Sequence, residues 1–109
     1  MAYNEETGER LREELETVAD ISERKMFGGI SFLLGGNMAV GVVGEELCVR
    51  VGPDAFDEAL KLPGARIMDF TGRPMRGWVF VAQEGFVDEK TLGAWVKRGT
   101  DFARILPPK

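Results

Sequence analysis

The chain has 109 residues, of which 44% are hydrophobic and 29% charged, and its formal charge is −4. This length suits one domain with its own core, and the composition argues against disordered and low-complexity proteins. Histidine is absent and Cys48 is the only cysteine. These counts exclude an internal disulfide, a multi-cysteine or histidine-ligated metal site and a histidine-assisted nucleophile. We therefore expect one domain over residues 1–109, with no metal, no cofactor and no enzymatic activity.

Negative charge is concentrated at the N-terminus. Residues 1–23 contain eight acidic and two basic side chains, whereas residues 24–109 contain ten acidic and twelve basic ones. An acidic leading segment repels phosphate, so direct binding to nucleic acid is not expected. The N-terminus lacks the basic and apolar segments of a signal peptide, and six glycines interrupt the nineteen uncharged residues of 26–44. We therefore expect no membrane span and a cytoplasmic protein.

The first predicted element is a helix capped by Asn4, with acidic residues in its first turn. Apolar or small residues recur at helical spacing from Leu11 to Ser22, and charged residues occupy the other positions. Gly8 costs about 1 kcal/mol relative to alanine, so the stable part of this helix is expected from Glu9 onwards. We interpret its acid-rich surface as a solvated face rather than a docking site.

Alternating apolar residues predict three strands joined by short turns within residues 24–51. The Gly-Gly-Asn sequence of residues 35–37 suits a tight reversal that needs positive φ, and Gly44 opens a second turn. Connections this short require antiparallel pairing, so a meander is expected. The adjacent Gly28 and Gly29 indicate a bulge or the close approach of another backbone.

The second half of the chain predicts two helices and two further strands. A short helix is expected to begin at Pro53, and a longer one after the N-cap Asp88, with a hydrophobic staple between Val87 and Leu92. The two strands are expected over residues 66–70 and 77–82. The order is therefore α-βββ-α-ββ-α. It indicates an α+β fold with an antiparallel sheet of about five strands and helices packed against it.

Two residues could carry chemistry, and each also has a plain structural role. Asp69 lies between expected strand residues, where it could bind a small ligand or anion together with nearby arginines, or simply pair with them. Those arginines are Arg66, Arg73 and Arg76. Cys48 has no histidine to activate it, so a nucleophile is not expected. A ligand-binding protein or an enzyme built on Asp69 is the alternative to a non-enzymatic domain.

A group of basic and apolar side chains lies at the start of the first strand and around the turn at residues 71–76. If the sheet brings these segments together, they form an anion-accepting edge beside exposed methionine and tryptophan. Arginine beside such side chains is typical of the core of a protein interface. The other interpretation is that they are dispersed and solvated, or pair with the acidic first helix. The candidate partner-binding residues are Arg24, Lys25, Arg73, Met75, Arg76 and Trp78.

Four segments carry motifs that occur together in one known family. They are Arg-Lys-Met-Phe-Gly-Gly at 24–29, Gly-Asn-Met at 36–38, Leu-Cys-Val-Arg-Val at 47–51 and Met-Asp-Phe-Thr-Gly-Arg-Pro-Met-Arg-Gly-Trp at 68–78. These segments resemble the N-terminal domain of the TfoX/Sxy family. The resemblance extends from about Glu9 to the C-terminus and is greatest to small stand-alone members.

The resemblance implies an α+β unit with an antiparallel sheet. Full-length bacterial members promote competence-gene expression by assisting a partner transcription activator, and they carry a second, helical C-terminal domain for which this chain has no room. The family has no established catalytic residues. We therefore expect a protein partner, such as a transcription regulator, and an accessory role in competence-type regulation. Formation of a homodimer is a further alternative, because an unprotected sheet edge can pair with the same edge of a second copy.

Overall fold

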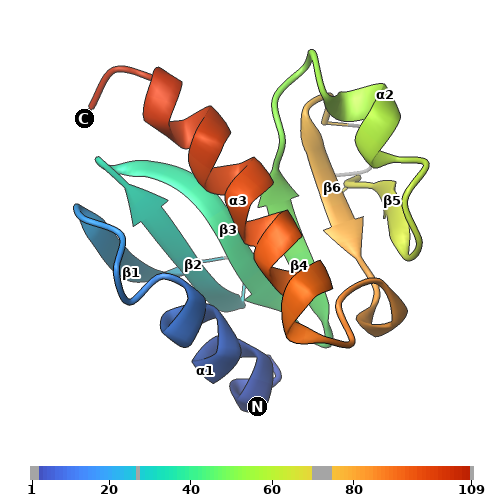
Figure 1. The fold of residues 1–109 in the computed structure, drawn as a ribbon, viewed down its shortest axis with the longest axis horizontal. Helices are drawn as coiled ribbons and strands as arrows, with labels where there is room; N and C mark the ends of the chain where they lie inside the picture. The colour runs from blue at the N-terminus through green and yellow to red at the C-terminus, as the bar shows by residue number, and fades with distance from the viewer. Residues whose placement is uncertain (1–2, 27, 70–74, 109) are drawn as a thin grey trace.

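A computed structural model describes residues 3–26, 28–69 and 75–108, which contain a six-stranded antiparallel sheet with its main helices on one face (Figure 1). The strands lie in the order β1-β2-β3-β4-β6-β5. The elements are α1 (Glu5–Glu14), β1 (Ile21–Met26), β2 (Gly29–Leu34), β3 (Asn37–Val43), β4 (Glu46–Arg50), α2 (Phe56–Ala59), β5 (Ala65–Ile67), β6 (Trp78–Val81), the 3-10 turn η1 (Gln83–Gly85) and α3 (Glu89–Ile105). The expected α+β class and antiparallel sheet are confirmed.

The structure adds one strand, β1, where the helical spacing predicted that the first helix continues to Ser22. Instead α1 ends at Glu14, and Asp20 adopts a φ of 65° before the chain enters the sheet. The side chains of residues 22–25 are exposed because β1 lies at the edge of the sheet, so no apolar alternation marks it. Arg12 ties α1 to β1 by donating to both carboxylate oxygens of Glu23 at 2.8 and 2.9 Å, which lowers the pKa of Glu23.

The stable part of the first helix also begins earlier than expected. Asn4 caps it as predicted, because its Oδ1 accepts a hydrogen bond from the backbone nitrogen of Thr7 at 3.1 Å. The regular helix extends from Glu5, as this cap predicts, so its stable part is not confined to residues from Glu9 onwards, and it includes the buried Gly8. A Cβ at Gly8 would lie 3.2 Å from the ring of Tyr3. The absence of a side chain at Gly8 therefore makes room for the ring of Tyr3. This tertiary contact outweighs the low helix propensity of glycine.

Two predicted helix starts are partly wrong. Pro53 is not helical, since α2 begins at Phe56. Asp88 does cap α3, but its neighbour Val87 is 73% exposed, so the hydrophobic staple with Leu92 does not form. Instead, Arg10 of α1 holds in place the segment that leads into α3. Its guanidinium donates to the backbone carbonyl oxygens of Phe86 at 3.0 Å and Val87 at 3.2 Å.

The glycines predicted to shape the meander do so. Gly35 and Gly36 reverse the chain between β2 and β3 with φ values of 60° and 87°. The predicted close approach of another backbone occurs at Gly29, because a Cβ there would lie 2.0 Å from the carbonyl oxygen of Val42. These positions fix the pairing of β2 with β3, whose register shifts between Phe32 and Leu33.

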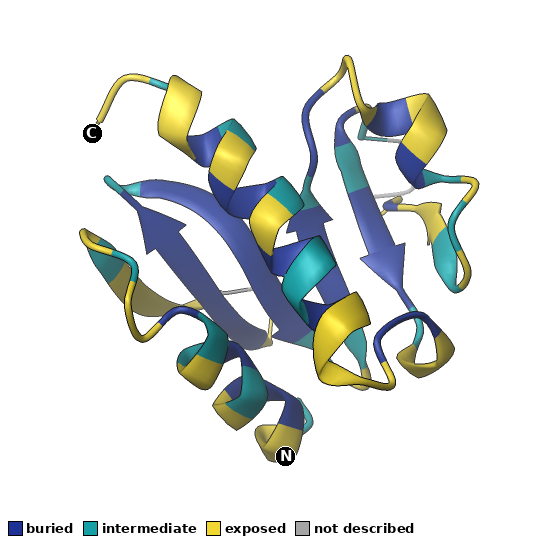
Figure 2. Cartoon of the chain, in the orientation of Figure 1, coloured by how far each residue is buried: buried dark blue, intermediate teal, exposed yellow. Residues whose placement is uncertain are grey.

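The sheet separates two hydrophobic clusters. The larger lies between the sheet and the layer formed by α1 and α3, and it contains alternate residues of β2, β3, β4 and β6, strands that are themselves largely buried (Figure 2). The smaller, on the opposite face, consists of Met38, Cys48, Met68 and Phe80, with Met75 and Trp78 packed against it. Among the described residues, no helix is long and apolar enough to cross a membrane.

Candidate functional site

The predicted partner-binding residues do not all lie together. Arg24 and Lys25 are exposed on β1 at one edge of the sheet, whereas β5 with Arg66 forms the other edge. Strands β2, β3, β4 and β6 lie between them, so the sheet does not bring the two basic segments together. The charged side chains of β1 disfavour edge-to-edge pairing, although the homodimer stays a prediction. Arg73 lies outside the described residues.

The residues around the start of β6 do share one region. Arg76 is exposed, lies over the ring of Phe56 at 5.3 Å and is 3.6 Å from the carboxylate of Asp57. Met75 and Trp78 are half-buried against the smaller cluster rather than exposed as expected. Their burial gives this end of the sheet a fixed apolar surface with one flexible, charged side chain beside it.

The alternative site around Asp69 is not assembled among the described residues. Asp69 is exposed just after β5. Arg66 pairs with Glu46 and Arg76 with Asp57, so both described arginines of the proposed constellation have other partners. The part of the chain that the structure describes also holds no group of three or more cysteine, aspartate or glutamate side chains suited to a metal ion.

Cys48 is fully buried on β4, and its Sγ lies 3.4 Å from the Sδ of Met68. Burial raises the pKa of Cys48 to about 12. At pH 8 the native thiol is therefore almost entirely neutral, and we expect it to react with a disulfide reagent roughly a thousandfold more slowly than the unfolded chain does. Labelling in buffer and in guanidinium measures both rates, and prompt labelling of the native protein would contradict this burial.

The same pKa shift makes stability depend on alkaline pH. The unfolded thiol ionises from about pH 8.5 upwards, whereas the native thiol stays neutral to about pH 12. The stability that Cys48 contributes is complete below the first value and is lost as the pH rises towards the second. Cys48 is thus a core residue, which agrees with the expectation that it is not a nucleophile.

Sequence reasoning missed Arg50, the last residue of β4. Its guanidinium carbon lies 5.0 Å from the ring centroid of Trp78 and 5.3 Å from that of Phe102 on α3. Arg98, one turn before Phe102, lies over the ring of Trp95 at 4.9 Å. Neither arginine has a carboxylate within 4.0 Å among residues 3–26, 28–69 and 75–108. Five other arginines of these ranges do have one: Arg10, Arg12, Arg66, Arg76 and Arg104.

A groove of about 380 Å³ lies between α3 and the segment that joins β4 to α2. We call it the α3 groove. Ile105, at its end, is 76% exposed although its side chain is aliphatic. Arg98 and Phe102 line the groove directly, and Arg50 contacts Phe102. The apolar lining consists of Val51, Pro53, Ala55, Phe102 and Ile105.

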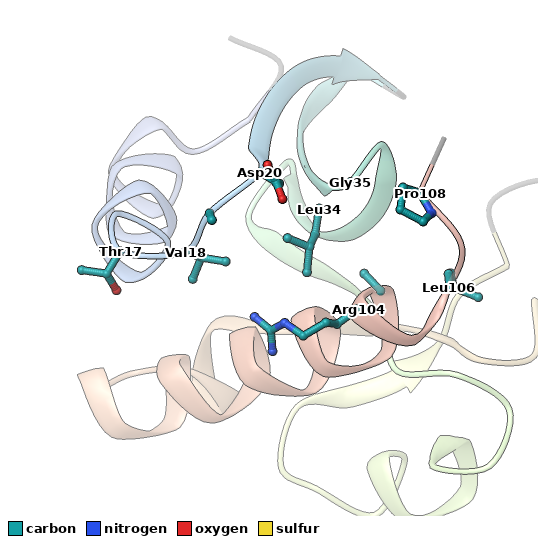
Figure 3. A pocket seen from close by; sticks show the side chains of 10 residues that line it. Thr17, Val18, Asp20, Leu34, Gly35, Arg104, Leu106 and Pro108 are labelled. Atoms are coloured by element: carbon teal, nitrogen blue, oxygen red, sulfur yellow. The ribbon is translucent and has the colours of Figure 1, made fainter.

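A second pocket, of about 360 Å³, lies between the α1–β1 loop, the β2–β3 turn and the end of α3 (Figure 3). Hydrogen bonds from Gly35 N to the Asp20 carbonyl oxygen and from Asn37 Nδ2 to the Pro107 carbonyl oxygen hold its walls together, at 3.1 and 2.9 Å. Arg104 lines this pocket, but Asp101 already pairs with it at 3.4 Å. Arg98 and Arg50 at the α3 groove, in contrast to Arg104, have no carboxylate partner among the described residues.

Comparison with known proteins gives one match. A model of the TfoX N-terminal domain family matches residues 13–103, which include Arg50, Arg98 and Phe102. The resemblance inferred from the motifs is thereby confirmed. The chain matches no curated protein and no solved structure.

Proposed function

Because the chain belongs to the TfoX N-terminal domain family, we propose that it acts without catalysis, by binding another protein as an accessory factor in competence-type transcriptional regulation. The observation that supports this proposal is the guanidinium of Arg50, which has no carboxylate partner among the described residues and lies over the rings of Trp78 and Phe102, the second of which lines the apolar α3 groove. Arginine and tryptophan are the residue types that most often dominate binding energy at protein interfaces.

The proposed binding surface comprises one end of the sheet and the adjoining part of α3. Trp78 and Met75 supply apolar area that is already ordered by packing, so little side-chain entropy is lost on binding. Arg76 adds an exposed charge beside them. Arg24 and Lys25 lie at the far edge of the sheet and are not part of this surface.

Affinity capture from a lysate of the source organism tests the proposal. The bait is the intact chain, compared with an Arg50→Glu/Arg76→Glu variant. The matched control is Lys61→Glu/Lys90→Glu, which makes the same change of charge at exposed positions away from the proposed surface. We expect the bait and the control to retain the same protein partner and the variant to retain at least tenfold less. Equal recovery with all three baits would contradict the proposed surface.

A genetic readout separates regulation from mere binding. Transcripts are compared between a deletion strain and strains complemented with the intact chain, the variant and the control. We expect the intact chain and the control to restore the same set of transcripts, and the variant to leave them unrestored. Restoration by the variant would contradict the proposed role.

A further inference from the structure

We propose that the α3 groove binds a segment of a partner protein in which acidic residues flank an aliphatic residue. This inference rests on the proposed function and adds the chemistry of the partner. It follows from three features: two arginines whose guanidiniums have no acceptor among the described residues, the apolar lining next to them and the charge around the groove.

The donors come from Arg50 and Arg98. Neither guanidinium donates a hydrogen bond to an acceptor within the described part of the chain, and each is positioned by aromatic rings instead. A cation–π contact holds the charge in place but satisfies no N–H group. The planar fork of a guanidinium matches a carboxylate, which accepts two N–H bonds at once. Each arginine is therefore preorganised to receive one carboxylate.

The apolar lining of the groove lies next to these donors. Arg98 and Phe102 are four residues apart on α3 and so share one face of the helix, and the Phe102 ring also contacts Arg50. Phe102 thus brings Arg50 next to the groove that Arg98 lines. Ile105 continues the apolar surface and is 76% exposed, which leaves it free to pack against an incoming side chain. The groove therefore combines apolar surface with one arginine in its lining, Arg98, and a second, Arg50, against the ring of Phe102.

The charge around the groove favours peptide carboxylates over phosphates. Asp54 and Asp101 lie on its rim, and the whole chain has a net charge of −4. Lys97 and Arg104 neutralise Asp101, at 2.8 and 3.4 Å, but the rim still repels a multiply charged anion such as a nucleic acid. A segment with only two carboxylates carries less negative charge than a nucleic acid, so it meets less of that repulsion while each carboxylate can still pair with one arginine.

The test is an NMR titration of the ¹⁵N-labelled full chain. The probe is the blocked peptide acetyl-Gly-Glu-Leu-Glu-Gly-amide, compared with one peptide in which glutamine replaces both glutamates and another in which serine replaces the leucine. We expect amide shifts confined to the groove residues, and at least tenfold weaker binding of both altered peptides. Equal binding of the glutamine peptide, shifts outside the groove or no shifts at millimolar peptide would each overturn the inference.

Protein variants and competing anions make the test specific. Arg50→Gln/Arg98→Gln is expected to lose the acidic peptide, whereas the control Lys61→Gln/Lys90→Gln, at exposed positions outside the groove, keeps it. Both pairs remove two positive charges, so a difference between them reports position rather than net charge.

Inorganic phosphate or a single-stranded oligonucleotide that bound the groove as well as the peptide would show a general anion site. Concentration-dependent self-association through the groove would identify a second copy as the occupant. Either result would overturn the inference.

Failure of this inference is distinguishable from failure of the proposed function. Partner capture that depends on Arg50 and Arg76, without binding of the acidic peptide, would leave the proposed function standing and reject the acidic–aliphatic segment. Peptide binding in the groove without any captured partner or transcriptional effect would support the groove chemistry and reject the regulatory role.

Discussion

Replacing Gly99 by alanine is expected to destabilise the protein, although alanine is the better helix former. A Cβ at position 99 of α3 would lie 2.4 Å from the carbonyl oxygen of Ala39 and 3.4 Å from Cγ1 of Val49. The first of these atoms is backbone in the middle of the sheet, so α3 must move away from β3 to relieve the overlap. The gain in helix propensity is about 1 kcal/mol. Overpacking of this kind more than offsets it, and we expect a net loss of about 1–3 kcal/mol.

Gly93→Ala is the matched control, because Gly93 lies in the same helix. A Cβ there would lie 3.1 Å from Oε1 of Glu14, the mobile end of a side chain that can move aside. We expect this variant to be as stable as the parent or more stable, by up to about 1 kcal/mol. Denaturant unfolding followed by tryptophan fluorescence compares the two. If both variants were equally stable, α3 would not approach β3 as closely as the structure shows.

Phe32→Ala is expected to have the largest effect on stability. Phe32 is 1% exposed on β2 and belongs to the cluster beneath α1 and α3. Removing its ring takes apolar area out of the core and leaves a cavity that the sheet can only partly close. The expected cost is about 3–5 kcal/mol. A domain of this size is typically stable by about 5–15 kcal/mol, so this one change consumes a large fraction of the total.

Ile67→Ala provides the comparison for this prediction. Ile67 is an aliphatic residue in a strand too, but it is 43% exposed on β5 at the sheet edge. We expect its loss to change stability by about 0.5 kcal/mol or less. Equal unfolding midpoints for the two variants would contradict the assignment of Phe32 to the main core.

Local signals predicted much of the fold. The caps at Asn4 and Asp88 depend on a side chain and a backbone group only three residues apart, so the sequence contains both partners. The turn at Gly35 and Gly36 depends on φ angles that glycine adopts without strain. The strand β1 was missed because it lies at an edge, where only one flank is paired and the side chains of residues 22–25 face solvent.

The candidate site was predictable only in part. Trp78, Met75 and Arg76 were proposed from composition, and the structure places them together at the start of β6. The pairing of Arg76 with Asp57 could not be inferred, because it requires the position of α2. Arg24 and Lys25 were grouped with them on the condition that the sheet brings the segments together, and the strand order separates them.

The sequence by itself determined what this protein lacks and how its chain is divided: no imidazole, one thiol, an antiparallel meander and an amphipathic last helix. Only the tertiary structure decided which arginines lack a carboxylate partner within residues 3–26, 28–69 and 75–108. Arg50 and Phe102 are 52 positions apart and meet because α3 crosses the sheet over β3 and β4. Such a contact depends on how helix and sheet pack, and neither periodicity nor composition contains that information.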